Sequence, residues 1–231
     1  MRSYVFRPRR RIFDFSLTVW IIILNFLVFV ILSAIFGRSL FSGGGFVLKN
    51  IALSFNNILH FRVWTLLTSM FMHGSWTHLI FNMVSLFFIG SFVEKIIGRR
   101  RYFWLYILGG IFAGLFFVTL AGLFGDFSWG AKLFGTKFVF AVGASGAIFA
   151  LGGLLSVLTP KMRVWVMFVI PLPMWVAMVG LLGFFWLMSL SLPIGIGNTA
   201  HLGGLLAGVF YGFYLKKKFP RKIKYLQSRF R

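Results

Sequence analysis

The chain has 231 residues, of which 59% are hydrophobic and 12% are charged, and it contains no cysteine. This apolar composition excludes a soluble globular domain and predicts an integral membrane protein. The lack of cysteine excludes disulfide bonds, thiolate metal sites and a cysteine nucleophile. The formal net charge of +21 would suit a nucleic-acid partner. We expect no such partner, because the basic residues lie in short segments between apolar runs, where they orient membrane helices and attract lipid headgroups.

Six apolar segments approach the ~20 residues that cross a bilayer. In chain order they cover residues 17–36, 77–97, 102–124, 142–158, 164–188 and 198–215. We therefore predict an all-α membrane protein, with one membrane domain over residues 1–231 and a six-transmembrane-helix core at 17–215. The first apolar segment is not followed by a small-residue cleavage site, so we expect it to be retained as a helix.

A long connection, residues 37–76, separates the first two predicted helices. It begins with Gly43-Gly44-Gly45 and continues as a mixture of polar and apolar residues. The segment is too polar to span a membrane and too apolar for free water, so we predict an interfacial, partly re-entrant loop. A disordered external loop is the alternative.

Lysine and arginine are divided unequally between the two sides of the predicted bundle. Nineteen of the 24 lie in the two terminal segments and in the second and fourth connections, and the other five lie in the first and third connections. Positive charge favours the cytoplasmic side, so both termini are expected there, which requires an even number of spans. We predict a multi-pass protein of the cell membrane, with residues 1–16 and 216–231 as basic cytoplasmic segments.

A serine and a histidine lie at matching depths in the fourth and sixth predicted helices. Ser145, in the motif Gly143-Ala144-Ser145-Gly146, precedes Pro160 by 15 residues, and His201 precedes Lys216 by 15 residues. At 1.5 Å per residue, both lie roughly 22 Å above the inner face. Ionisable groups at such depth are functional candidates, so we predict that Ser145 is a nucleophile and His201 its general base. The alternatives are a serine bonded to the preceding turn and a structural histidine.

The second predicted helix carries two polar residues near the same depth, His78 and Asn82. Their spacing of four residues places them on one face of a helix. We predict that both, with the backbone N–H of Ser145, form an oxyanion hole. A hydrogen bond between helices is the alternative role. His73, which precedes this helix, is expected to tie the long connection to the core.

Small residues recur every four positions on the sixth helix, at Ala200, Gly204, Gly208 and Gly212. Gly146 and Ala150 repeat in the same way on the fourth helix. Ridges of small residues allow helix backbones to approach closely in lipid. We therefore expect these two helices to pack together and to bring Ser145 and His201 into contact.

The chain contains only three carboxylates, Asp14, Glu94 and Asp126. None lies at the depth of His201, so any hydrolytic mechanism would use a serine–histidine dyad. An intramembrane aspartyl protease and a metalloprotease are excluded, because their carboxylate and histidine sets are missing. We expect no metal and no cofactor. Glu94 is expected to pair with the basic residues 99–101 at the inner face.

These motifs together resemble the rhomboid intramembrane serine proteases, over nearly the whole chain. The resemblance is carried by Gly143-Ala144-Ser145-Gly146, by His78-Leu79-Ile80-Phe81-Asn82 and by Ala200-His201-Leu202-Gly203-Gly204. It implies the minimal six-helix form, a Ser145–His201 dyad, and His78 and Asn82 around the oxyanion. The chain departs from the family pattern at Thr65, where arginine often follows Trp64, and at Phe149, where tyrosine is common.

The resulting functional hypothesis is a serine endopeptidase that acts through an acyl-enzyme. The resemblance implies that its substrates are membrane-anchored proteins, cut within or near a transmembrane segment. Two alternatives remain open: a non-catalytic rhomboid-like protein that binds membrane proteins, and a small transporter. Transporters are expected to show inverted repeats and broken helices with polar sites at the midplane.

Overall fold

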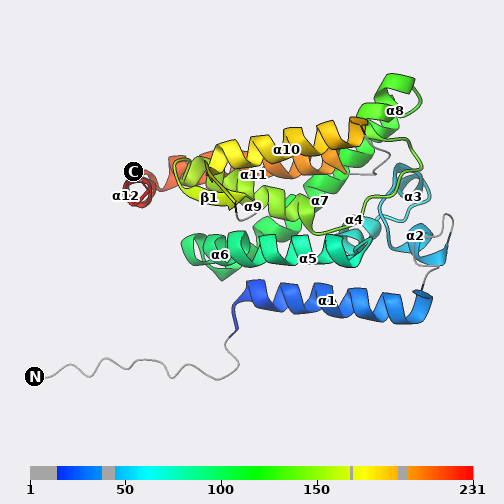
Figure 1. The fold of residues 1–231 in the computed structure, drawn as a ribbon, viewed down its shortest axis with the longest axis horizontal. Helices are drawn as coiled ribbons and strands as arrows, with labels where there is room; N and C mark the ends of the chain where they lie inside the picture. The colour runs from blue at the N-terminus through cyan, green and yellow to red at the C-terminus, as the bar shows by residue number, and fades with distance from the viewer. Residues whose placement is uncertain (1–14, 38–44, 167–168, 192–196, 231) are drawn as a thin grey trace, which may run out of the picture.

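The computed structural model describes residues 15–37, 45–166, 169–191 and 197–230. Within them, six helical rods run side by side along the long axis of the molecule (Figure 1). They are α1 (Leu17–Phe36), α5 (Trp76–Ser85) continued by a π-helical stretch (Leu86–Gly90) and α6 (Ser91–Ile97), α7 (Arg99–Phe124), α9 (Ser145–Leu158), α10 (Met174–Ser191) and α11 (Asn198–Lys218). The predicted helical class is therefore confirmed.

Four of the described helices are long and apolar enough to cross a membrane: Leu17–Phe36, Trp76–Ile97, Arg99–Phe124 and Met174–Ser191. The helix α9 has only 14 residues, and nearly all of them are buried. The helix α11 is longer but begins with the buried polar residues Asn198 and Thr199. Because α9 and α11 pack mainly against protein, they need less lipid-compatible surface than their neighbours. The count of six spans stays a prediction.

Three predicted helices agree closely with the structure. The helix α1 has the predicted bounds, α7 begins three residues earlier than expected, and α11 ends three residues later. The predicted second helix is also present, interrupted by its π-helical stretch. Long uninterrupted apolar segments specify helix positions well, because their ends coincide with charged residues or glycine.

The fourth helix begins later than predicted, at Ser145 instead of residue 142. Gly143 adopts a φ of 118°, which is incompatible with a helix and unfavourable for other residues. Its N–H donates to the Ser69 carbonyl oxygen at 2.8 Å, and Ala141 pairs with Leu53 in an isolated β-bridge. These contacts hold the preceding segment extended, so Ser145 becomes the first residue of α9.

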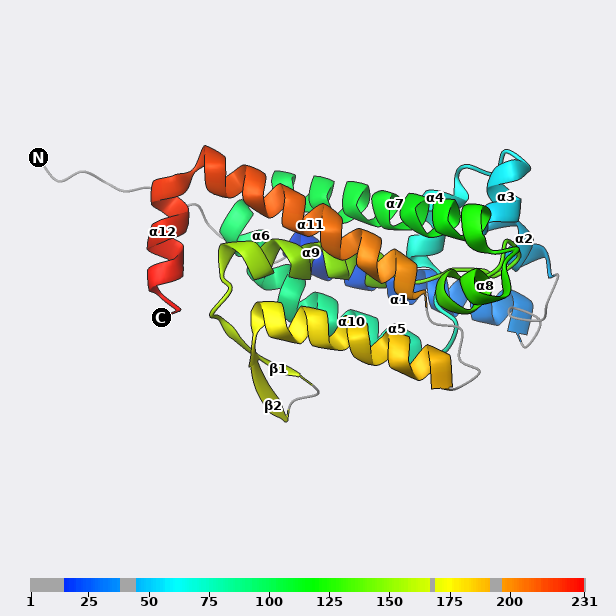
Figure 2. The same cartoon turned by 90° about the horizontal axis from the view of Figure 1, so that it is seen from above.

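The predicted fifth helix, at 164–188, is wrong at residues 164–166 and 169–173, while residues 167–168 lie outside the described residues. Strand β1 (Arg163–Val166) pairs antiparallel with β2 (Ile170–Pro173), and α10 starts only at Met174. Pro171 and Pro173 remove the amide donors that a helix interior needs, while valine, tryptophan and isoleucine favour strands. Figure 2 shows this hairpin beside the start of α10.

The long connection after α1 is ordered where the structure describes it. It forms α2 (Phe46–Asn50), α3 (Phe55–Leu59), α4 (Thr65–Thr68) and a 3-10 turn (Ser69–Phe71). The buried Asn57 amide donates to the carbonyls of Leu48 and Ala52, and its oxygen accepts from Arg62 at 3.1 Å. The alternative of a disordered loop is thus wrong for residues 45–75, whereas Gly43 and Gly44 lie outside the described residues.

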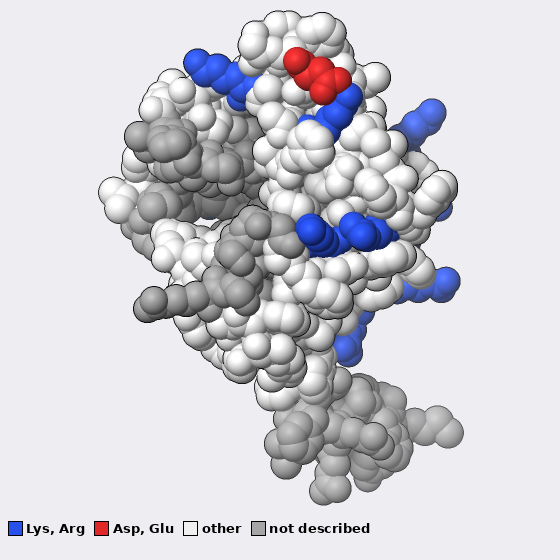
Figure 3. Space-filling model, turned by 90° about the vertical axis from the view of Figure 1, so that its right-hand side faces the viewer, with Lys and Arg blue, Asp and Glu red and all other residues white. Residues whose placement is uncertain are grey.

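The two ends of the bundle differ in charge. Figure 3 faces the end that carries α2, α3 and α8 (Ser128–Phe134), and it shows scattered basic side chains on a mostly uncharged surface. At the opposite end, an unpredicted helix, α12 (Pro220–Ser228), crosses the bundle (Figure 2). The expected basic segment 216–231 is therefore largely helical. Most of the expected N-terminal segment, residues 1–14, lies outside the described residues.

Glu94 has a different main partner from the one predicted. Its carboxylate accepts from the backbone N–H groups of Leu17 and Thr18 at 2.8 and 2.9 Å, and from the Thr18 hydroxyl at 2.7 Å. Arg99 lies farther away, at 3.7 Å. The carboxylate thus satisfies the free amides at the start of α1, where negative charge is favoured, and the ion pair is secondary.

The backbones of α9 and α11 touch without intervening side chains. A Cβ atom built on Gly204 would lie 2.0 Å from the carbonyl oxygen of Gly146, and one on Gly208 would lie 1.9 Å from that of Ala150. No side chain fits at either place. The expected close packing of the two helices through small residues is confirmed.

We predict that Gly208→Ala destabilises the protein by about 1–3 kcal/mol, because the methyl group must push the two backbones apart. The matched control is Gly180→Ala on α10, where a Cβ meets nothing within 4 Å. This control should be neutral or slightly stabilising, because alanine favours helices over glycine. Thermal unfolding followed by circular dichroism in detergent measures both. Equal melting temperatures for the two variants would contradict the tight contact.

Candidate active site

The structure brings Ser145 and His201 together. Ser145 is the first residue of α9, and His201 lies in the first turn of α11. The distance between Ser145 Oγ and His201 Nε2 is 2.8 Å, which is a hydrogen bond. The contact of Gly204 with Gly146, next to Ser145, sets this distance. A serine hydroxyl that donates to a neutral imidazole is the arrangement in which the imidazole can accept the hydroxyl proton.

The ring of His201 is held by aromatic packing. Phe149 stacks on it with ring centroids 4.6 Å apart and an angle of 12° between the planes, and Phe185 contacts it at 5.6 Å. Within the described residues, Nδ1 of His201 has no hydrogen-bond partner. Glu94 and Asp126 are bonded elsewhere, to α1 and to Lys137. Packing by Phe149 therefore orients the ring without the tyrosine hydroxyl that is common at this position.

His78 lies beside the turn that precedes Ser145. The Gly74 N–H donates to His78 Nδ1 at 3.3 Å, and the Ser75 hydroxyl oxygen accepts from the His78 N–H at 3.1 Å. Because Nδ1 accepts a hydrogen bond, the proton of the neutral ring belongs on Nε2. A Cβ built on Gly143 would lie only 2.8 Å from His78 Nε2, so this N–H lies against the turn.

Asn82 lies one helical turn further along α5 and is buried. Its amide nitrogen donates to the His78 carbonyl oxygen at 3.0 Å and lies 3.6 Å from a Cβ built on Gly143. Across the described residues, neither His78 nor Asn82 forms a hydrogen bond with the Ser145 side chain. The structure thus places two side-chain donors around Gly143, two residues before Ser145.

The backbone N–H of Ser145 is a third donor near Gly143. The sequence predicted this donor, but the reason that it is free, the start of α9 at Ser145, is seen only in the structure. Since α9 starts at Ser145, the first amides of this helix have no acceptor within the helix. They point toward the start of α9, where the helix dipole favours negative charge. The glycine at 143 is the signal in the sequence that could have placed the helix start here.

His73 packs against His78 instead of serving only to anchor the loop. The two ring centroids are 5.1 Å apart in an edge-on arrangement, and His73 is 1% exposed. Burial, with a smaller contribution from His78, lowers the pKa of His73 to about 3. The ring is therefore neutral at pH 7 and supports the position of His78 by contact.

The connection between α1 and α5 is anchored differently from the Trp-Arg pattern that is common in the family. The Trp64 indole N–H donates to the Asn50 carbonyl oxygen at 2.8 Å. The Thr65 hydroxyl donates to the Arg62 carbonyl oxygen at 2.6 Å. Thr65 therefore closes a local turn.

Over the described residues, no group of three or more histidine, aspartate or glutamate side chains is arranged to hold a metal ion.

Comparison with known proteins gives consistent matches. The Rhomboid domain family matches residues 60–218, a range that contains all four candidate residues. RHOMBOID-like protein 5 of Arabidopsis thaliana is 32% identical over 157 residues, which is 66% of this chain and 44% of the relative. Rhomboid protein 1, mitochondrial, of Saccharomyces cerevisiae is 32% identical over 158 residues, 66% of this chain and 42% of the relative. Rhomboid protease GlpG of Yersinia pestis is 27% identical over 205 residues, 85% of this chain and 64% of the relative.

The chain therefore spans between about two fifths and two thirds of the length of these relatives. The alignment with the bacterial relative covers more of this chain than the other two do. All three similarities extend over most of the helical bundle described above.

We predict that Gly143→Ala destabilises the protein by about 1–3 kcal/mol, because the new methyl group meets the His78 ring and a φ of 118° strains alanine. The double variant Gly143→Ala/His78→Ala removes the clash but keeps the backbone strain. Its loss should therefore be smaller than the sum of the two single losses. Melting temperatures of the four proteins test this, and strictly additive losses would contradict the contact.

Proposed function

Because this chain belongs to the rhomboid family, we propose that it is an intramembrane serine endopeptidase. The family resemblance seen in the sequence is confirmed by the match over residues 60–218. The proposed reaction is the cleavage of membrane-anchored proteins within or near a transmembrane segment. The observation that carries the proposal is the 2.8 Å hydrogen bond between Ser145 Oγ and His201 Nε2. The name of the Yersinia pestis relative, a rhomboid protease, also supports it.

In the proposed mechanism, Ser145 Oγ attacks the carbonyl carbon of the scissile peptide bond while its proton passes to His201 Nε2. The tetrahedral intermediate collapses as the C–N bond breaks and His201 gives the proton to the leaving amine. This step leaves an ester between Ser145 and the substrate. Water then attacks the ester carbon, with His201 as the base, and the serine hydroxyl is restored.

The proposed oxyanion hole consists of His78 Nε2–H, the Asn82 amide and the Ser145 N–H. The arrangement supports this assignment because two of these donors lie beside Gly143 and the third opens α9. Donors that are fixed before the reaction stabilise the charge that develops on the carbonyl oxygen. The hydrogen bond from Gly74 to His78 Nδ1 leaves the Nε2 proton free for this role.

The chain is a multi-pass membrane protein, and we propose the cell membrane as its location, with both termini in the cytoplasm. The basic residues at the end with α12 support this orientation. We also propose that substrates enter from the lipid past α10. This helix is poorly buried, and a Cβ atom built on Gly180 or on Gly183 would meet nothing within 4 Å. A loosely packed helix can move aside at low cost.

We predict that a fluorophosphonate reagent labels the wild-type protein at Ser145 in detergent, because only an activated serine reacts with it. The variants Ser145→Ala and His201→Ala should lose the label, the first for want of the nucleophile and the second for want of the base. Mass spectrometry identifies the labelled residue, and melting temperatures show that the variants fold. Unchanged labelling of folded His201→Ala would overturn the dyad. Absence of wild-type labelling would instead favour a non-catalytic membrane-protein binder or a transporter.

We predict that Asn82→Ala lowers the turnover of a single-span substrate protein by about 10²–10³-fold, the usual cost of losing one oxyanion donor. Labelling of Ser145 should persist, because the Ser145–His201 pair is intact. The matched control is Asn50→Ala, whose side-chain amide donates to the Phe46 carbonyl oxygen within α2, away from the candidate site. Rates of substrate cleavage in liposomes measure the effect. A rate for Asn82→Ala equal to that of the control would remove Asn82 from the oxyanion hole.

A further inference from the structure

A groove lies between α12 and the last turn of α6, at the end of the bundle away from α8. Its volume is about 570 Å³. Three basic side chains, Lys95, Arg221 and Lys222, line it together with three apolar ones, Ile96, Ile223 and Leu226. A wall that combines cations with aliphatic groups matches a ligand that is anionic at one end and apolar at the other.

The groove is held in place because α12 is docked on the bundle. Ile223 is buried, and Phe230 packs edge-on against Phe92 of α6 with ring centroids 5.9 Å apart. The Gln227 amide donates to the Val157 carbonyl oxygen at 3.3 Å, near the end of α9. These contacts join α12 to both α6 and α9.

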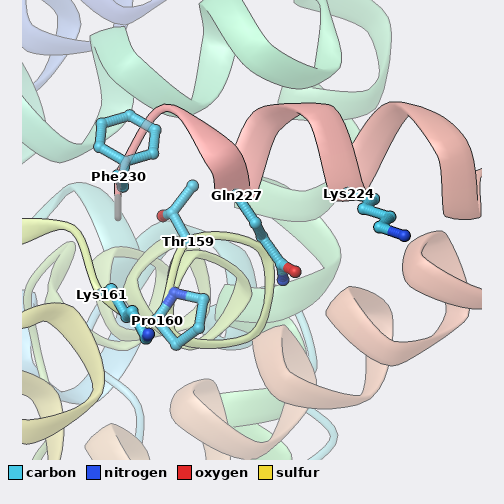
Figure 4. Close-up of a pocket in the computed structure, with 6 residues that line it drawn as sticks. All are labelled: Thr159, Pro160, Lys161, Lys224, Gln227 and Phe230. Atoms are coloured by element: carbon cyan, nitrogen blue, oxygen red, sulfur yellow. The ribbon is translucent and has the colours of Figure 1, made fainter.

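A second hollow, of about 210 Å³, lies on the α9 side of the same helix. Figure 4 shows Thr159, Pro160 and Lys161 after α9, with Lys224, Gln227 and Phe230 opposite them. Lys161 and Lys224 add two cations to those of the groove. Basic side chains therefore flank α12 on both sides.

The cations of the groove have no anionic partner among the described residues. Glu94, the neighbour of Lys95, is bonded to the start of α1 and lies near Arg99. Asp126 pairs with Lys137, in the connection between α7 and α9. Since unpaired cations beside apolar surface attract anions, the groove is electrostatically complementary to a negatively charged ligand.

We propose that this groove binds an anionic phospholipid, with the phosphate between Lys95, Arg221 and Lys222 and an acyl chain against Ile96 and Leu226. The helices α6, α9 and α11 all end at this face (Figures 1 and 2), so the groove lies where headgroups meet the ends of membrane helices. An amphipathic basic helix that lies across the ends of spans fits an interfacial position. The site is separate from Ser145, at the other end of α9, and does not depend on catalysis.

The test is the binding of short-chain lipids to the purified full-length protein in detergent, followed by native mass spectrometry. Dioctanoyl phosphatidylglycerol should bind saturably, and dioctanoyl phosphatidylcholine at least about tenfold more weakly. Inorganic phosphate at the same concentration should not compete, because it lacks the acyl chains. Competition by phosphate at equal strength, or equal binding of the zwitterionic lipid, would overturn the proposal.

The variant Lys95→Gln/Lys222→Gln should weaken binding of the anionic lipid by at least about tenfold, since each cation near the headgroup contributes about fivefold. Both lysines are exposed, so α12 should stay docked, and an unchanged melting temperature without lipid verifies it. The matched control, Lys216→Gln/Lys217→Gln, removes the same charge at the same end but outside the groove. It should change binding by less than about twofold. Equal weakening in both variants would show diffuse attraction and refute a defined site.

Discussion

The backbones of α9 and α11 meet directly, and this contact positions both residues of the candidate site. Gly204 and Gly208 face carbonyl oxygens of α9 with no space for a side chain. Lipid provides no hydrophobic drive between helices, so close packing of small residues holds such a pair together. Ordinary helix pairs lie about 8–10 Å apart, and the closer approach here lets Ser145 on one helix reach His201 on the other.

The candidate site also depends on a short departure from helical structure. At Gly143 the backbone turns, and its N–H is satisfied by Ser69 of the long connection. Non-helical backbone in a membrane domain is tolerated only where protein surrounds it, and the bridge between Leu53 and Ala141 provides such cover. The turn has two consequences: it leaves the first amides of α9 free, and it makes room for the His78 ring.

The chain has few carboxylates, and none of the described ones contacts His201. Phe149 orients the His201 ring by stacking, while the Glu94 carboxylate accepts hydrogen bonds at the start of α1. Positive charge that no carboxylate balances lies at the end of the bundle with α12, whose basic residues have no acidic partners in the described structure. The same shortage of negative charge thus leaves the hydrogen-bonded pair Ser145 and His201 without a carboxylate, and it leaves a cationic groove at the opposite end of α9.

The amino-acid pattern alone was enough to predict the helical class, the bounds of α1 and the juxtaposition of Ser145 with His201. Position along a helix follows from the local rise per residue, so counting from Pro160 and Lys216 placed the two residues at the same level of the bundle. Small-residue spacing also predicted which helices would touch. Three features became clear only in the folded chain: the hydrogen bond between Gly143 and Ser69 that fixes the start of α9, the pairing of β1 with β2, and the docking of α12 across the bundle. Each of these depends on contacts between residues distant in the chain, or on a strand partner, which propensity within one segment does not specify.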